Sequence, residues 1–276
     1  MKLKPVLLAL SLSACQQPTT YAPHATPEEI QAEQMRQQQM VDEVKAQGGT
    51  PRNWKRQKNM AGRFEGVASR IEKSGAEICQ ELGVPQQGRP CYYYFKTQDG
   101  EDLNAYADGK NVVVYSGMLA FLHSDAELAT VLSHELAHNL MGHPQATQNN
   151  AAAGALLGVA VDALAGSQGY GTNGEFTKMG ASAGVLRYSA PFELEADYVG
   201  MYIMARAGFD ITQAPGLWRR MSLENPQGIY NSTTHPTHAE RFVALNKTIN
   251  EITSKKKIGM ELLPERQQMQ EAGAPW

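Results

Sequence analysis

The stretch Thr130–His143, TVLSHELAHNLMGH, places two histidines and a glutamate inside an apolar segment of the chain. On a helix, residues four apart share a face, so the ring nitrogens of His134 and His138 can point to one position. Imidazoles at this spacing are typical zinc ligands. The upstream sequence Ser124-Asp125-Ala126-Glu127 is a capping box, which predicts that a helix begins there and carries both histidines.

Glu135 follows the first histidine and cannot reach the coordination position that the two imidazoles share. Its carboxylate can reach a water molecule bound there, which is where a hydrolase needs a general base. This is the arrangement of thermolysin-type zinc peptidases, and it requires a third protein ligand. His143 does not fit, because a metzincin would have glycine at the position of Met141 and histidine at that of Pro144. We expect His143 to be structural or at the surface.

The sequence FELEAD, residues 192–197, offers the third ligand. Glu193 and Asp197 lie four apart, and one carboxylate completes a His₂Glu catalytic site. Asp197 would then accept the second N–H of a ligand histidine and fix its tautomer. Glu195 is expected to point away, since two residues turn a helix by about 200°. Acidic residues are also favoured at the N-terminus of a helix by the helix dipole, and this would explain FELEAD taken alone. It would not explain why FELEAD and HELAH occur in the same chain.

Four segments of the chain together resemble the gluzincin metallopeptidases, a family that includes HtpX, BepA and the CAAX prenyl proteases. The resemblance extends from Met60 to Ile249, and its segments are NAYADGKNVVVYSGMLAFL, AELATVLSHELAH, YSAPFELEADYVG and THPTHAERF. It implies one zinc ion per chain, with ligands, base and supporting carboxylate at the positions already considered: His134, His138, Glu193, Glu135 and Asp197.

The resemblance also implies roles that the spacing does not. A sheet edge is expected to bind an extended peptide substrate through its backbone, at Asn104, Ala105, Tyr106 and Ala107. His235 matches a family histidine near the metal, where it would stabilise the oxyanion or occupy the open position of an idle enzyme. The alternative for His235 is a cap before Pro236. Arg241 is interpreted as a substrate clamp or an ion pair, and Ala190 departs from the arginine that relatives usually carry.

The N-terminus predicts export and lipid attachment. Lys2 and Lys4 precede an apolar run that is too short to span a bilayer and is typical of a secretory signal. The run ends in Leu12-Ser13-Ala14-Cys15, which resembles a bacterial lipobox with Cys15 as the lipidated residue. The alternative is an ordinary signal with an incidental cysteine. Gln16 is not the aspartate that retains lipoproteins in the inner membrane, so we expect an outer-membrane anchor on the periplasmic face.

The two remaining cysteines would meet an oxidising environment in an exported chain. Cys79 and Cys91 flank the turn-rich segment GVPQQGRP, and we predict a disulfide between them. The alternative is a pair of buried thiols, either in a reducing compartment or too far apart to be bridged.

Composition and helix signals divide the chain into four parts. These are a signal peptide at 1–14, a lipid-anchored flexible tether with a short helix at 15–58, a zinc metallopeptidase domain at 59–257 and a C-terminal tail at 258–276. The tether is rich in Gln, Pro and Thr, and Thr26-Pro27-Glu28-Glu29 predicts a helix that ends near Gln47.

Within the domain, hydrophobic spacing predicts helices and a small sheet. One or two helices are expected between Met60 and Gly83, and later helices from about 191 to 207 and from about 236 to 253. Strands are expected at 92–96, 105–107 and 112–115. The Ala-rich segment 151–166 is short for a membrane span and contains Asp162, so we expect a packed helix or a lid.

Composition is consistent with one sizeable domain, since 42% of the 276 residues are hydrophobic. The net charge of -3 does not indicate a basic surface that would bind nucleic acid.

The predicted fold is α+β, a mainly helical zincin-like metallopeptidase domain with a small β-sheet and an HExxH active-site helix. The predicted protein is a hydrolase, a zinc metalloendopeptidase that cleaves misfolded or misassembled cell-envelope proteins. The alternative is a chaperone-like or assembly-factor lipoprotein whose zinc site is mostly closed by His235. The sequence carries no signal for the oligomeric state.

Overall fold

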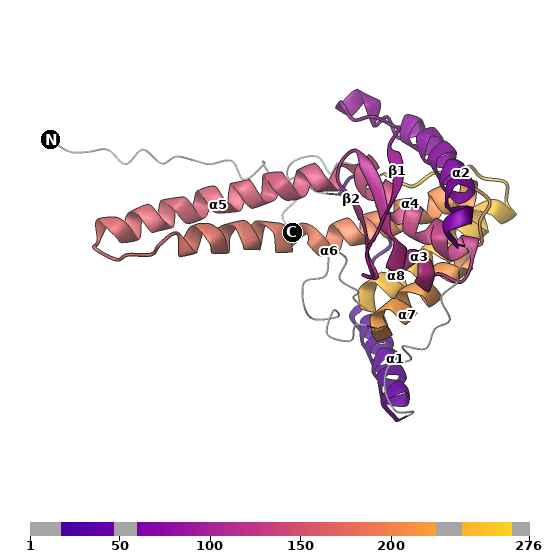
Figure 1. Cartoon of the computed structure of the whole chain (residues 1–276), viewed down its shortest axis with the longest axis horizontal. Coiled ribbons are helices and arrows are strands. Elements are labelled where there is room, and N and C mark those ends of the chain that lie inside the picture. Colours follow the sequence, from indigo (N-terminus) through magenta and orange to yellow (C-terminus); the bar gives the residue numbers. More distant parts are fainter. Residues whose placement is uncertain (1–17, 47–59, 225–238, 267–276) are drawn as a thin grey trace. The chain divides into compact units, whose positions relative to one another are not determined.

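The computed structural model describes residues 18–46, 60–224 and 239–266, apart from the side chains of residues 186–188. It is mainly helical and contains a small sheet, as the sequence predicts (Figure 1). The described chain forms two compact units, a smaller one made by residues 145–189 and a larger one made by residues 18–144 together with 190–266. Both motifs that carry the predicted metal ligands belong to the larger unit.

Helices supply most of the larger unit. Those contained within it are α1 (Pro27–Ala46), α2 (Met60–Glu81), α3 (Ser116–Phe121), α4 (Asp125–Met141), α7 (Ala214–Glu224) and α8 (Ala239–Lys257), with short 3₁₀ turns η1 (Pro85–Gln87) and η2 (Ile211–Gln213). Two further helices, α5 (His143–Ser167) and α6 (Glu175–Arg206), have residues in both units.

Helix α4 lies at the centre of the larger unit, because every residue from Ala126 to Met141 is buried. It packs against α2, where Gly75 leaves room for Leu136: a Cβ at Gly75 would lie 2.3 Å from Leu136 Cδ2. The predicted capping box begins the helix, with Ser124 Oγ accepting the N–H of Glu127 at 3.2 Å. Buried on all sides and capped, α4 is a rigid support for the histidines that it carries.

The sheet has three strands, β1 (Tyr94–Gln98), β2 (Ala105–Ala107) and β3 (Asn111–Tyr115), in the order β1-β3-β2. Strand β1 is parallel to β3 and β2 is antiparallel to it. Strand β2 is therefore an edge of this sheet, and both β2 and β3 contact α4. The tight β2–β3 turn contains Gly109 at φ 91°, a left-handed conformation that glycine adopts without strain.

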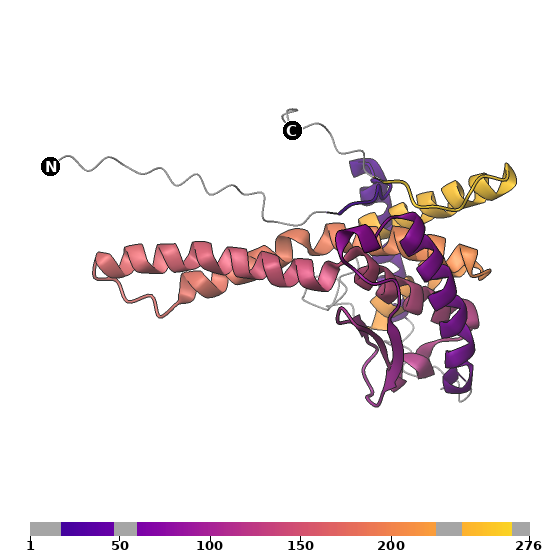
Figure 2. The same cartoon turned by 90° about the horizontal axis from the view of Figure 1, so that it is seen from above.

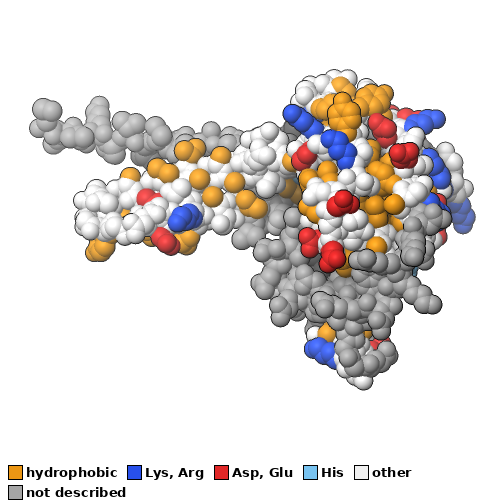
Figure 3. All heavy atoms as spheres, viewed as in Figure 1, with side chains coloured by type: hydrophobic (Ala, Val, Ile, Leu, Met, Phe, Trp, Pro, Cys, Tyr) orange, Lys and Arg blue, Asp and Glu red, His pale blue; other side chains and the backbone are white. Residues whose placement is uncertain are grey.

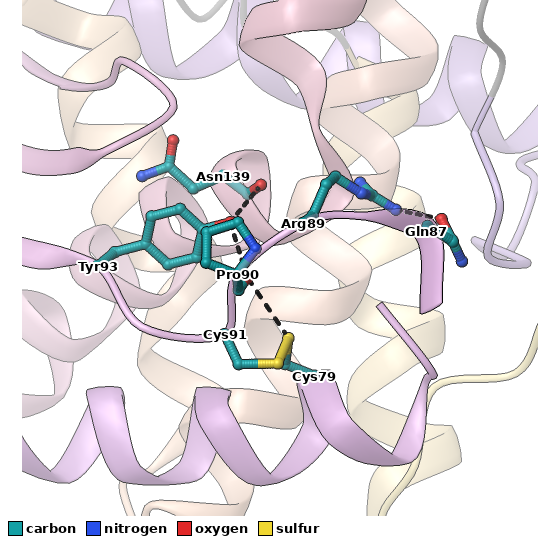
Figure 4. The surroundings of a disulfide bond; sticks show 7 residues. All are labelled: Cys79, Gln87, Arg89, Pro90, Cys91, Tyr93 and Asn139. Carbon is teal, nitrogen blue, oxygen red and sulfur yellow. Dashed lines mark hydrogen bonds between the residues drawn. A yellow bond between two sulfur atoms is a disulfide. The ribbon is translucent and has the colours of Figure 1, made fainter. Parts of the chain in front are cut away.

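The predicted disulfide between Cys79 and Cys91 is present and closes the loop that follows α2 (Figure 4). Next to it, the Tyr93 hydroxyl lies 3.1 Å from the carbonyl oxygen of Asn139, in the last turn of α4. Arg89 lies over Gly142, the C-cap of α4, where a Cβ would be 2.7 Å from Arg89 Nη1. The disulfide therefore constrains a loop that packs against the C-terminal end of α4.

The smaller unit is a hairpin in which α5 and the first half of α6 run side by side (Figures 1 and 2). Glycines allow the backbones to approach closely: a Cβ at Gly154 would lie 2.0 Å from the carbonyl oxygen of Gly180. Apolar side chains remain exposed along α5 (Figure 3), at Leu156, Leu157, Val159, Val161 and Leu164. Among the described helices, α5 is long and apolar enough to cross a membrane by length and composition, a test that core helices and signal sequences also pass.

The structure corrects several predicted boundaries. Helix α6 begins at Glu175 and not near Pro191, as was predicted. The prediction was wrong because proline is typical of the first turn of a helix, whereas Pro191 lies inside this one. The region after Met60 forms one helix, and the Ala-rich segment belongs to a helix of 25 residues. Helices α3 and α7 were not predicted, and the predicted start of the last helix near residue 236 lies outside the described residues.

The segment before α1 and the segment after α8 pair with each other. Thr20 forms an isolated antiparallel bridge with Arg266, and the N–H of Tyr21 donates to the carbonyl of Glu265 at 2.8 Å. The helix predicted inside the tether is α1, and it packs against α8. The four domain boundaries stay predictions, but residues 18–46 belong to the larger unit.

Candidate metal centre and active site

Two helices bring the three predicted ligands together. His134 and His138 on α4 and Glu193 on α6 are buried, and their ligand atoms all lie within 4.8 Å of one another. The two Nε2 atoms are 3.1 Å apart, and the oxygens of Glu193 lie 3.3 Å from His134 Nε2 and 3.2 Å from His138 Nε2. Gly200 allows the helices to approach, since a Cβ there would lie 3.1 Å from the backbone nitrogen of His134.

This donor set fits zinc. Two imidazole nitrogens and one carboxylate oxygen are the ligands of a catalytic His₂Glu site. In a tetrahedral zinc site with bonds of about 2.0 to 2.1 Å, neighbouring ligand atoms lie about 3.3 Å apart. The three separations measured here, 3.1, 3.2 and 3.3 Å, agree with the edges of such a tetrahedron. Three protein ligands leave a fourth position for water or substrate.

Asp197 supports the first ligand, as its spacing from Glu193 predicts. Its Oδ1 lies 3.0 Å from His134 Nδ1, the ring nitrogen opposite the metal position. Arg241 on α8 binds both oxygens of Asp197, at 2.7 and 2.9 Å, and reaches Glu193 Oε2 at 2.8 Å. Arg241 is therefore at least an ion-pair partner, the second of its two predicted roles. Its charge balances two carboxylates that would otherwise repel each other.

The charges of this cluster shift its acid–base equilibria. Burial would lower the pKa of His134, but hydrogen bonds to Asp197 and Glu193 raise it from 6.5 to about 10. Burial would raise the pKa of Asp197, but Arg241 and His134 hold it below its usual value. Burial lowers the pKa of His138 well below 6.5. Zinc and a proton therefore compete for His134, while His138 is neutral and ready to bind metal.

The second ligand has a support that the sequence reasoning missed. Nδ1 of His138 lies 2.8 Å from Nδ1 of His143, and Nε2 of His143 lies 2.8 Å from Oε2 of Glu195. All three side chains are buried, and the ring of Phe192 stacks on that of His143, with centroids 4.4 Å apart. The expectation of a structural or surface position for His143 is therefore half right: it is buried, and it contacts a ligand.

A signal for this support existed in the sequence. Gly142 ends α4 in the left-handed conformation at φ 77°, and α5 begins at once with His143, so the chain turns back toward His138. Glu195 does point away from the ligand group, as expected, but it points into a buried contact and not into solvent. In the sequence, this signal is a histidine that directly follows a glycine at the end of the HExxH helix, together with a carboxylate in FELEAD that the metal site does not use.

Glu135 lies on α4 between the two ligands in sequence, and only 1% of the residue is exposed. Burial alone would lower the pKa of Arg241, but the negative charges of Asp197, Glu193 and Glu135 raise it. Glu135 therefore shares the electrostatic environment of the metal centre. A carboxylate held there is suited to accept and return a proton.

The predicted substrate edge lies beside the same helix. Asn139 on α4 binds the β2–β3 turn with its side chain, accepting the N–H of Gly109 at 2.8 Å and donating to the carbonyl of Asn111 at 3.0 Å. The carbonyl of Asn104 and the N–H of Asp108 bond to β3. Because strand residues alternate, the backbone groups of Ala105 and Ala107 point to the open edge of β2.

Two predicted site residues lie outside the described residues. They are His235, interpreted as an oxyanion, latching or capping residue, and Cys15, the predicted site of lipidation. Both stay predictions.

A buried pair of ligand histidines from an HExxH helix, completed by a glutamate from a later helix, defines a zincin-like metallopeptidase domain. The chain belongs to peptidase family M48, whose profile matches residues 66–249.

Named relatives agree with this assignment. The chain is 32% identical over 149 residues to the mitochondrial metalloendopeptidase OMA1 of Saccharomyces cerevisiae. The aligned region covers 50% of this chain and 41% of the relative. It is 31% identical over 140 residues to the putative beta-barrel assembly-enhancing protease of Vibrio cholerae, covering 48% and 29%. The beta-barrel assembly-enhancing protease of Escherichia coli K12 is 25% identical over 173 residues, covering 58% and 35%. The chain thus spans less than half the length of these relatives.

Proposed function

We propose that this protein is a zinc-dependent metalloendopeptidase that hydrolyses unfolded or misassembled proteins of the cell envelope. The observation that carries the proposal is the buried triangle of His134, His138 and Glu193, next to Glu135 and with separations that suit one zinc ion. The family and the names of the relatives support the peptidase chemistry.

The chain supplies the groups that such a hydrolysis needs. Zinc, when bound, acts as a Lewis acid and makes water more acidic. Glu135 accepts a proton from the attacking water and returns it to the leaving amine, so that one carboxylate serves both halves of the reaction. Asp197 and Arg241 hold His134 in the tautomer that leaves Nε2 free to bind metal.

Strand β2 is the proposed substrate site. An extended peptide that pairs with its open edge would bond to the backbone groups of Ala105 and Ala107 and lie beside α4. Backbone pairing reads no particular side chain, so it suits a peptidase with many substrates. It also requires an extended segment, which unfolded proteins expose and folded ones rarely do.

The setting of the enzyme is part of the proposal. The lipobox-like sequence ending at Cys15 supports a lipid anchor at the periplasmic face of the outer membrane. A disulfide between Cys79 and Cys91 is consistent with an oxidising compartment. Two of the relatives are named for β-barrel assembly, which supports outer-membrane proteins as substrates.

The test compares one outer-membrane β-barrel protein in two states, urea-denatured and diluted or folded in detergent, as a substrate of the purified zinc-loaded protein. We expect the unfolded state to be cleaved and the folded state to resist. Equal cleavage of both would contradict selection of extended segments, and cleavage of neither would favour an assembly factor with a closed site. In cells, Cys15→Ser should remove the protein from the outer-membrane fraction, and an unchanged distribution would contradict the lipid anchor.

A further inference from the structure

The carboxylate of Glu195 is bound by the beginning of the described chain. Its Oε1 accepts the backbone N–H groups of Thr19 and Thr20 at 2.6 and 2.7 Å, and the hydroxyl of Thr20 at 3.0 Å. Thr20 is only 2% exposed, and it lies 175 residues from Glu195 in the sequence. Thr20, in a segment that composition assigns to a flexible tether, is therefore buried against the residue that supports His143.

The hydrogen bonds from the metal position to this segment run in one direction. A metal ligand needs its lone pair on the nitrogen that faces the metal, so His138 carries its proton on Nδ1 and donates it to Nδ1 of His143. His143 then carries its own proton on Nε2 and donates it to Glu195. Glu195 accepts at both oxygens, which only a carboxylate can do when every neighbour is a donor.

We propose that residues 18–22 are part of the metal centre, and that Glu195 and His143 are positioning residues through which Thr19 and Thr20 orient His138. The inference rests on the proposed zinc site. Without the four donors from Thr19 and Thr20, Oε1 of the buried carboxylate would lose these hydrogen bonds, and Glu195 would no longer be held in the position that bonds to His143. Docking of this segment therefore raises the affinity of the site for zinc.

The segment before α1 would then serve both the metal centre and the membrane anchor. Cys15 precedes Thr19 by four residues, which span at most about 14 Å when fully extended. If Cys15 carries the lipid, the segment that completes the metal centre is also the segment next to the membrane anchor. A chain whose N-terminal segment is displaced from Glu195 would then bind zinc weakly, which links catalytic competence to correct placement of the anchor.

Glu195→Gln in the full chain tests the direction of the hydrogen bonds. If the amide oxygen faces Thr19 and Thr20, the amide nitrogen donates to Nε2 of His143 and reverses both histidine tautomers. Nε2 of His138 would then carry a proton toward the metal position. If the amide is turned the other way, its nitrogen meets two backbone N–H donors. Either orientation weakens zinc binding, and we expect the dissociation constant to rise 10- to 100-fold in a chelator competition.

Glu33→Gln is the matched control, because Glu33 is also a buried carboxylate, paired with Arg36 and Arg219, but has no part in this chain of bonds. Its zinc affinity should equal that of the wild type. A second readout is the ¹⁵N–¹H spectrum of the histidine rings, in which His143 should carry its proton on Nε2 in the wild type. In Glu195→Gln the proton should move to Nδ1 when the new amide oxygen faces Thr19 and Thr20. A purely structural role for Glu195 would not move this signature.

The N-terminal segment is tested by replacing Thr19 and Thr20 with proline, which removes both backbone donors. Ala25→Pro, in the same segment but outside the contacts with Glu195, is the control. We expect weaker zinc binding in the double variant and none of this effect in the control. If the double variant does not fold, as judged by circular dichroism, Thr20→Val keeps the N–H, removes the hydroxyl and should weaken zinc binding in the same direction by a smaller factor.

Equal zinc affinity of the wild type and a folded Thr19→Pro/Thr20→Pro protein would overturn the inference, as would an unchanged zinc affinity in Glu195→Gln. These outcomes would leave the proposed zinc site intact. A wild-type protein that binds no zinc would instead refute the site itself.

Discussion

At the scale of single residues, the metal centre is held by two different supports. Nδ1 of His134 lies 3.0 Å from Asp197, which is neutralised by Arg241, whereas Nδ1 of His138 lies 2.8 Å from a second histidine, His143, which contacts Glu195. Both supports fix the tautomer of a ligand, but they connect the site to different parts of the chain. The first leads to α8 and the second to the segment before α1.

Asp197→Asn should weaken the first support. The substitution removes the charge that pairs with buried Arg241 and allows the amide nitrogen to face His134, so the zinc dissociation constant should rise about 10- to 100-fold. Competition with a chromogenic chelator measures this constant. Glu81→Gln, which removes a surface ion pair with Arg206, is the control. An unchanged affinity in Asp197→Asn would show that this carboxylate does not support the ligand.

At the scale of elements, α4 depends on interactions at both of its ends. At its start, Glu127 accepts the N–H of His123 at 2.6 Å and binds Arg220 of α7 with both oxygens, at 2.6 and 2.9 Å. At its end, Tyr93 and Arg89 of the disulfide loop pack on the last turn. The helix that presents the ligands is thus tied to α7 and to the loop after α2.

Glu127→Gln should lower the free energy of unfolding by about 1 to 3 kcal/mol at neutral pH, as expected for hydrogen bonds to a buried charged group. Burial opposes the shift, but Arg220 and the N–H of His123 lower the pKa of Glu127 below 4.5. A carboxylate with a lowered pKa in the folded state stabilises above its ordinary value, and this contribution is lost as the pH falls below it.

Urea unfolding at a series of pH values checks the prediction. Wild type and Glu127→Gln should differ most near pH 7 and converge in acid. Glu65→Gln, at an exposed position of α2, should follow the wild type. A constant difference across the whole range would show that the lost stability is not electrostatic.

The disulfide loop makes a separate contribution to stability. A bridge across a sequence separation of 12 restricts the unfolded chain, and its loss should cost about 3 kcal/mol. The variant Cys79→Ala/Cys91→Ala should therefore melt at a lower temperature than the wild type, and a reductant should lower only the melting temperature of the wild type. If the reductant leaves the wild type unaffected while the bridge is chemically reduced, the loop does not support α4.

At the scale of the whole molecule, the site was predictable where it depends on local spacing. HELAH and FELEAD place their residues by helix periodicity, and the structure brings His134, His138 and Glu193 together as that spacing implies. The bond between Thr20 and Glu195 joins residues that are 175 positions apart, and no local pattern in a Pro- and Thr-containing segment indicates such a partner. Tertiary contacts of this kind become visible only when the chain is folded.

The fold shows the same division. Strand positions and the start of α4 follow from β-branched runs and a capping box, and both were predicted to within a few residues. The start of α6 was not predicted, because Pro191 is an ordinary signal for the first turn of a helix. The helix extends back to Glu175 because the residues before Pro191 pack against α5. Local signals give the type of an element more securely than its ends.

The central claim, that this buried triangle hydrolyses peptide bonds with Glu135 as the base, is tested most directly by one paired measurement. Wild type and Glu135→Gln are compared for bound zinc and for the rate of cleavage of denatured casein. We predict one zinc per chain in both proteins and a rate about 10²- to 10⁴-fold lower in Glu135→Gln, since the amide cannot accept the proton. A zinc-loaded Glu135→Gln that cleaves as fast as the wild type would contradict the account.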